Sequence, residues 1–191
     1  IEFVTIGLNG DISCASDEVM EQVIQYCTNW KDRTFLLQTK SPERFTHFKY
    51  PGNVILGITL ETNRDTIWGN GRKDEPYVPA GAKLTKYNQI SKAPLPYERF
   101  THMCQIQHGR KMVTIEPILD FDMRGLILFL KYIAPERVYI GYDSGDFHLP
   151  EPPLQKTRKL VECLKAEGIT VFEKLMRPAW YEVEVEEKNK G

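Results

Sequence analysis

Six short runs of apolar residues, rich in β-branched and aromatic side chains, recur along the chain. Within each run the apolar residues follow one another almost continuously, without the alternation that marks a strand with one solvated face. Strands of a parallel sheet that is covered by helices have this pattern. The sequence therefore predicts six mainly parallel strands, at residues 3–6, 35–38, 54–60, 112–115, 138–140 and 170–172.

Helix signals lie between these runs. Ser16 or Asp17 can cap a helix after the first strand, and Pro42 suits the first turn of a helix after the second. Apolar stripes at 126–130 and 160–164 indicate two more helices. A repeated strand–helix unit needs right-handed parallel crossovers. It leaves an open doubly wound sheet or a barrel of the TIM type, complete or partial.

One long interval separates the third and fourth predicted strands. Residues 62–96 are rich in glycine and proline, and a helical pattern at 97–107 then resumes the repeat. We interpret 62–96 as a loop inside a single domain that covers residues 1–177. Loops of this length commonly act as lids or binding loops, and a surface excursion without function is the alternative. Residues 178–191 are expected to form a disordered acidic tail.

Composition narrows the functional classes. The 191 residues are 41% apolar, which suits one domain, and 25 Lys and Arg against 26 Asp and Glu give a net charge of −1. This balance provides no broad basic surface for nucleic acid. No apolar run approaches the roughly 18–20 residues of a membrane span, so we expect a cytoplasmic protein without membrane association. Because the chain starts at Ile1, directly before a predicted strand, we expect a fragment or a processed chain.

The cysteines and histidines are scattered. Their spacing matches neither a zinc site nor a compact disulfide scaffold, so we predict reduced thiols and no metal site. Glycine-rich nucleotide motifs and the serine-hydrolase elbow are also absent. The residues concerned are Cys14, Cys27, Cys104, Cys163, His47, His102, His108 and His148.

Polar residues follow each predicted strand, where parallel α/β folds form their ligand sites. Glu61 and Glu116 come directly after apolar residues, so they should point into the mouth of the sheet and need partners. Lys40 and Lys174 are the candidate partners. Such pairs are either structural, or they hold a charged substrate or poise a general base. The set at the strand ends is Asp11, Lys40, Glu61, Glu116, Asp143, Ser144 and Lys174.

In chain order, these strand ends resemble a known family. The segments 10–11, 37–45, 53–61, 115–120 and 139–145 are similar to those of phage- and archaea-associated radical-SAM-like proteins, over residues 3–177. The resemblance implies a parallel-stranded partial TIM-type barrel with its helices outside. In that family three cysteines on a preceding strand and loop hold an iron–sulfur cluster, which binds and cleaves S-adenosylmethionine (SAM). This chain lacks that segment, so the resemblance implies a cluster only with an upstream cysteine-rich segment.

The resemblance also implies a function. The chain would be the SAM- and substrate-facing part of an enzyme that acts on a small molecule or nucleotide, with loop 62–96 closing over the mouth. Tyr142 and Asp143 stand where the family commonly has glycine and glutamate, which predicts an altered pocket. The expected catalytic residues are Lys40, Glu116 and Lys174, and the expected cofactor-binding residues are Glu61, Asp143, Ser144 and Asp11.

Two other functions stay open on the sequence. One is a cluster-independent barrel enzyme, in which Lys40 or Lys174 forms a Schiff base or Glu116 acts as a general base. The other is a phage-associated module that binds nucleic acid through basic residues interleaved with aromatic ones. Its candidate residues are Lys31, Arg33, Lys40, Arg44, Phe35, Phe45, Phe48 and Tyr50.

Overall fold

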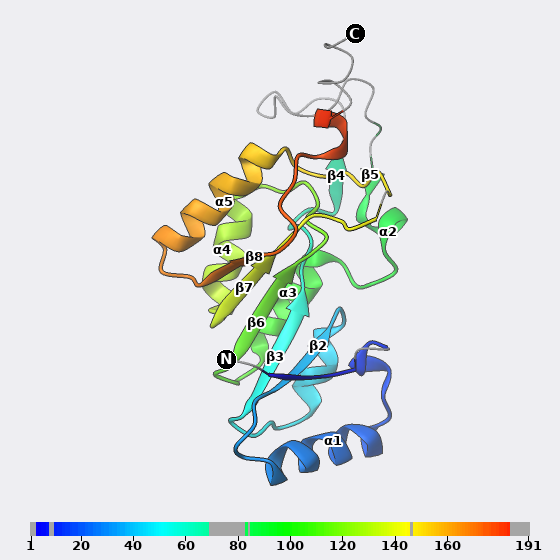
Figure 1. The fold of residues 1–191 in the computed structure, drawn as a ribbon. Coiled ribbons are helices and arrows are strands. Elements are labelled where there is room, and N and C mark those ends of the chain that lie inside the picture. Colours follow the sequence, from blue (N-terminus) through cyan, green and yellow to red (C-terminus); the bar gives the residue numbers. More distant parts are fainter. Residues whose placement is uncertain (1–2, 8–9, 69–82, 84, 146, 184–191) are drawn as a thin grey trace.

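The computed structural model describes residues 3–7, 10–68, 83, 85–145 and 147–183. Its main element is a twisted six-stranded sheet with helices packed along it (Figure 1). All neighbouring strands of this sheet are parallel, as the apolar runs predict. In spatial order the strands are β1 (Val4–Ile6), β2 (Phe35–Thr39), β3 (Val54–Thr59), β6 (Lys111–Ile115), β7 (Arg137–Ile140) and β8 (Val171–Glu173).

The spatial order of these strands is also their order in the chain. Right-handed crossovers that always step in one direction place their helices on one face of the sheet. A doubly wound sheet would instead reverse its strand order at a switch point, and this sheet has no reversal. Among the described residues no pairing joins β8 to β1.

The helices begin and end where local signals place them. The Ser16 hydroxyl accepts a hydrogen bond from the Val19 backbone at the start of α1, and Asp122 caps α4 in the same way. Gly168, with φ of +78°, follows the last turn of α5. The helical segments are η1 (Ile12–Cys14), α1 (Asp17–Asn29), η2 (Pro42–His47), α2 (Tyr87–Ile90), α3 (Pro96–Gln105), α4 (Met123–Ile133) and α5 (Leu154–Ala166).

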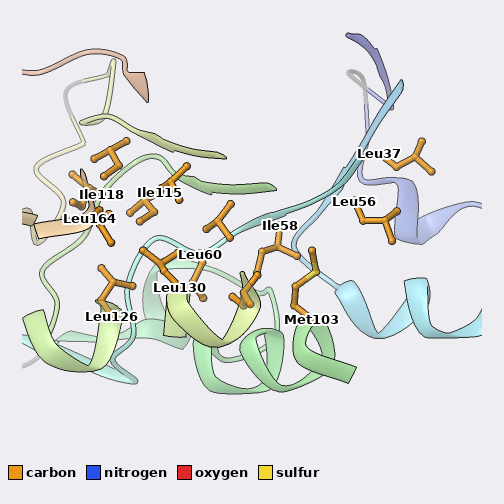
Figure 2. Close-up of a cluster of buried hydrophobic side chains, with 14 of the residues drawn as sticks. Leu37, Leu56, Ile58, Leu60, Met103, Ile115, Ile118, Leu126, Leu130 and Leu164 are labelled. Carbon is orange, nitrogen blue, oxygen red and sulfur yellow. The ribbon is translucent and has the colours of Figure 1, made fainter. Parts of the chain in front are cut away.

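The main core lies between the sheet and these helices. Leu56, Ile58 and Leu60 from β3 and its end pack in the same cluster as Met103 of α3 and Leu130 of α4 (Figure 2). Side chains at the alternate strand positions face the other side of the sheet. There Leu36, Ile55 and Met112 form a second, smaller cluster.

The long interval and the tail contain described structure. Within 62–96 lie an antiparallel pair, β4 (Thr66–Trp68) and β5 (Thr85–Lys86), and helix α2, whereas 69–82 and 84 lie outside the described residues. Residues 178–183, expected to belong to a disordered tail, pack on the body of the protein, and Ala179 is fully buried. Residues 184–191 lie outside the description. In the described ranges, no helix has the length and apolar character to cross a membrane.

Candidate functional site

The ends of β2 and β3 bring a lysine and a glutamate together. Lys40 follows β2 directly and Glu61 lies two residues beyond β3, on neighbouring parallel strands. The Lys40 Nζ atom lies 2.5 Å from Glu61 Oε1. The Glu61 side chain is only 3% exposed, whereas Lys40 is 39% exposed. Lys40 therefore connects a buried carboxylate to the surface of the site.

Glu61 has two further partners that come from other elements. Arg99 of α3 places Nη1 2.8 Å from Glu61 Oε2, and the Tyr87 hydroxyl donates to the same oxygen at 3.1 Å. Burial by itself raises the pKa of Glu61, but the positive charges of Arg99 and Lys40 outweigh burial and hold this pKa below its usual value. Glu61 is therefore an anion held by two cations and a hydroxyl, which fixes its position.

Arg99 and Tyr87 were not predicted as site residues. Arg99 is fully buried, its Nη1 also donates to the Thr59 carbonyl, and its guanidinium lies over the Tyr87 ring at 5.0 Å. One sequence signal was available: Arg99 shares the buried face of α3 with Pro96 and Met103. A charged residue on the apolar face of a helix indicates a buried partner of opposite charge.

Asp11 supports the end of β2 from the neighbouring loop. Its carboxylate accepts hydrogen bonds from the Lys40 backbone at 2.8 Å, from the Ser13 backbone at 3.0 Å and from the Thr39 hydroxyl. Partial burial raises the pKa of Asp11, and these donors, the Lys40 amide foremost, lower it by more. Asp11 thus holds the backbone that carries Lys40.

A second lysine–glutamate pair links β6 to β8. Lys174 Nζ lies 2.5 Å from Glu116 Oε2, with side chains 50% and 26% exposed. Gly141, after the intervening strand β7, makes room for this pair. A Cβ atom there would lie 3.1 Å from Glu116 Oε1 and 3.2 Å from Lys174 Cβ. A side chain at position 141 would therefore crowd the pair.

A pocket of about 620 Å³ opens at the same end of the sheet. Asp143 lines it, and its Oδ2 atom is buried without a hydrogen-bond partner among the described residues. Lys40 and Asp143 thus line one pocket, and one carboxylate oxygen of Asp143 is buried without a hydrogen-bond partner among the described residues. The lining residues are Lys40, Glu61, Thr85, Gln89, Ile90, Ser91, Pro117, Leu119, Asp143, Phe147, His148, Leu149 and Pro150.

The structure places the predicted site residues in three groups. Lys40, Glu61 and Asp143 line the pocket, and Asp11 is joined to it through the Lys40 backbone. Glu116 and Lys174 pair with each other and are not among the lining residues, although Pro117, next to Glu116, is. The exposed Ser144 does not line the pocket either, so the structure does not bring it to this site.

Tyr142 does not enter the pocket. It is fully buried, and its hydroxyl lies 3.0 Å from the Pro152 carbonyl and 2.7 Å from the Thr157 hydroxyl. Arg177 lies over its ring at 5.3 Å. The Tyr142 side chain is therefore part of the core beneath the end of β7. Asp143, the next residue, lines the pocket, and Tyr142 does not.

In the part of the chain that the structure describes, no three His, Cys, Asp or Glu side chains gather as a metal site would require. Cys27 is buried, and burial raises the pKa of its thiol to about 11. Cys14 and Cys104 are exposed. These cysteines do not fit an iron–sulfur cluster, which needs clustered thiolates.

No protein-family model, curated protein or solved structure matches this chain.

Proposed function

We propose that this chain is the SAM- and substrate-facing part of a radical-SAM-like enzyme, and that the pocket at the carboxyl ends of its strands binds SAM. The observation that carries the proposal is that Lys40, a cation, and Asp143, whose Oδ2 atom has no hydrogen-bond partner among the described residues, line one pocket of about 620 Å³. That volume lies within the range of small-molecule sites. The resemblance of the strand ends to the radical-SAM-like family supplies the identity of the ligand.

The strand order supports a partial barrel as the setting. A parallel sheet wound in one direction with its helices on one face is the arrangement of TIM-type barrels, whose ligand sites lie at the carboxyl ends of the strands. The six strands would form one part of such a barrel. The residues of 62–96 that line the pocket, namely Thr85, Gln89, Ile90 and Ser91, support a role for this loop at the mouth.

The pocket offers a partner for each part of SAM. Lys40 would pair with the carboxylate of the methionine moiety, and Asp143 would accept from its ammonium group or from the ribose hydroxyls. Phe147, whose side chain is exposed at the pocket, offers an aromatic face for the adenine. Glu61 already has three donors, so it would orient Lys40 instead of contacting the cofactor.

When SAM is cleaved reductively at an iron–sulfur cluster, it supplies radical chemistry that removes hydrogen atoms from a substrate. The cysteines of this chain do not fit such a cluster, so we assign them no part in that step. The residues here would bind and orient SAM and shield it from water. Lys174 and Glu116, at the adjoining strand ends, would face the substrate or a further part of the ligand.

The two alternative functions receive less support. A Schiff-base lysine needs an amine that is free to attack its substrate, whereas Lys40 and Lys174 each have a carboxylate partner at 2.5 Å. For nucleic acid, Phe35 and Phe45 are each 1% exposed, so they are core residues and cannot stack on bases. Arg44 pairs with Asp17 at 2.6 Å.

Calorimetric titration of SAM tests the proposal. We expect wild-type protein to bind SAM and Lys40→Met to weaken binding about tenfold or more, because a charge-assisted contact is lost. Binding of 5′-methylthioadenosine, which lacks the carboxylate, should not change. Lys131→Met, which alters an exposed lysine paired with Glu167, is the matched control. Failure of the wild type to bind SAM, or equal losses for both ligands in Lys40→Met, would contradict the proposal.

A further inference from the structure

The segment after β8 crosses the loop that forms one wall of the pocket. We call residues 176–182 the strap and residues 147–151 the pocket loop; both can be followed in Figure 1, in red and yellow. Phe147, His148, Leu149 and Pro150 of the pocket loop line the candidate site. The pocket loop belongs to no helix or strand, and its backbone hydrogen bonds run from the Asp120 amide to the Pro150 carbonyl at 2.7 Å and from the Glu151 amide to the Leu149 carbonyl at 2.8 Å. Side-chain contacts therefore contribute to holding it in place.

Arg177 of the strap makes the strongest of these contacts. Its Nη2 and Nη1 atoms lie 2.7 and 2.9 Å from the two carboxylate oxygens of Glu151, in the fork geometry that arginine alone provides. Nη2 also donates to the Asp143 carbonyl at 3.0 Å. Glu151 is 1% exposed, so this ion pair is shielded from solvent on one side. Arg177 thus joins the residue that carries the pocket carboxylate to the far end of the pocket loop.

The guanidinium of Arg177 has little freedom to move away. It lies over the Tyr142 ring, and the Tyr142 hydroxyl is fixed between Pro152 and Thr157. A planar guanidinium with an aromatic face below it and a bidentate carboxylate in its plane has its position defined in all directions.

Two further residues secure the strap. Trp180 donates from its indole Nε1 to the Leu149 carbonyl at 2.8 Å, and its ring lies 4.7 Å from that of His148. Glu182 Oε2 accepts from the Ala179 backbone at 2.7 Å and from the Leu154 backbone, in the first turn of α5, at 3.0 Å. The strap is therefore tied both to the pocket loop and to a helix of the main body.

We propose that Arg177 is a positioning residue for the candidate site: it holds Asp143 and the pocket loop in the arrangement that receives the ligand. Arg177 itself is not among the residues that line the pocket. The consequence for ligand affinity rests on the proposed function. The ordering of the pocket loop does not, and it can be measured without any ligand.

Hydrogen exchange measured by mass spectrometry on ligand-free protein tests the positioning role. In Arg177→Gln we expect the Glu151 amide of the pocket loop, which donates to the Leu149 carbonyl at 2.8 Å, to exchange about tenfold faster or more, since a charged hydrogen-bond network is lost. Peptides from β3 should exchange as in the wild type. Arg177→Lys should lie between the two, because lysine keeps the charge but not the fork. Arg158→Gln, an exposed arginine on α5, is the matched control.

The outcomes separate this proposal from the proposed function. Unchanged exchange in the pocket loop of Arg177→Gln, or an equal rise in β3, would overturn the positioning role. If wild-type protein binds SAM, Arg177→Gln should weaken that binding about tenfold. If Arg177→Gln speeds exchange in the pocket loop but leaves the affinity for SAM unchanged, the proposal that the strap affects ligand binding at the site is overturned. If wild-type protein binds no SAM, the proposed function fails and the exchange data still decide the role of Arg177. Should Arg177→Gln not fold, Arg177→Lys provides the same comparison.

Discussion

Three charged side chains, Lys40, Glu61 and Arg99, define the chemistry at the base of the pocket. Two cations share one buried carboxylate, so the cluster carries a net positive charge. Arg99 is fully buried and Lys40 is the member that reaches the surface. The positive charge is therefore presented to the pocket through Lys40, which suits an anionic group on the ligand.

Removing the charge of Glu61 should destabilise the protein. Glu61→Gln leaves Arg99 buried without its counter-charge, at a cost of about 3–5 kcal/mol in unfolding free energy. Urea denaturation at pH 7 measures this cost. Glu162→Gln, on an exposed face of α5, should change stability by about 0.5 kcal/mol or less. A loss for Glu61→Gln no larger than that of the control would show that Arg99 does not depend on this carboxylate.

The same variant has a predicted pH signature. The pKa of Glu61 is lowered in the folded protein from its usual 4.5, so its stabilising effect is complete above about pH 4.5. The effect is lost as the pH falls through the folded pKa. The difference in stability between wild type and Glu61→Gln should therefore shrink below pH 4.5. A difference that stays constant down to pH 3 would contradict a lowered pKa of Glu61 in the folded protein.

The sequence named Lys40 and Lys174 as candidate partners of Glu61 and Glu116, because charges at the buried ends of parallel strands need partners. It did not assign which lysine meets which glutamate; the structure pairs Lys40 with Glu61 and Lys174 with Glu116. Arg99 and Tyr87 come from elements whose position depends on the long interval between β3 and β6. Nothing in local sequence spacing places an α3 or α2 residue against the end of β3.

Among the elements, the turn between β2 and η2 positions the most exposed member of the cluster. The Asp11 carboxylate, at the start of η1, holds the Thr39 hydroxyl and the Lys40 amide. Two loops that follow neighbouring strands are thereby joined by one side chain. Asp11 does not line the pocket, and it contacts the site through the Lys40 backbone.

Asp11→Ala should weaken SAM binding through Lys40. We expect a loss of about threefold to tenfold, because the lysine backbone loses a charge-assisted hydrogen bond. In a Lys40→Met background the same change should have little further effect, since both substitutions act on one contact. Calorimetric titration of the two single variants and the double variant measures this coupling. Asp32→Ala, an exposed carboxylate before β2, is the control, and strictly additive losses would argue against a positioning role for Asp11.

Among the helices and strands, the sequence predicted those elements that a single local pattern marks. Continuous apolar runs predicted the six strands, and the Ser16 cap and Pro42 marked the starts of α1 and η2. The expectation of a disordered tail from residue 178 followed composition alone. It did not foresee that Trp180 and Glu182 satisfy backbone groups of the pocket loop and of α5. Such tertiary hydrogen bonds have no periodic pattern in the sequence.

For the whole molecule, the common direction of the strands decides which end of the sheet can hold a ligand. All six strands run in one direction, so their carboxyl ends lie at one edge, and the loops that follow them meet there. The sequence left doubly wound and barrel arrangements open because both repeat the same strand–helix unit. Only long-range pairing, such as β3 with β6, separates them.

A second pocket, of about 520 Å³, lies near the amino ends of β3 and β6. An experiment that locates the bound ligand can compare the two pockets. Phe45, Tyr50 and His108 line it, and His108 Nε2 lies 2.7 Å from the Val54 carbonyl at the start of β3. Aromatic side chains make this pocket a plausible competitor for an adenine-containing ligand. A ligand at one end of the sheet would leave the other end unchanged.

Hydrogen exchange over the whole chain, with and without saturating SAM, tests the location of the site most directly. We expect slower exchange in the segments that surround the first pocket: the end of β2 at Lys40, residues 85–91, residues 143–145 and residues 147–150. Residues 45–50 and 105–108, around the second pocket, should exchange at the same rate in both samples. Protection confined to 45–50 and 105–108, or no protection at any segment, would contradict a SAM site at the carboxyl ends of the strands.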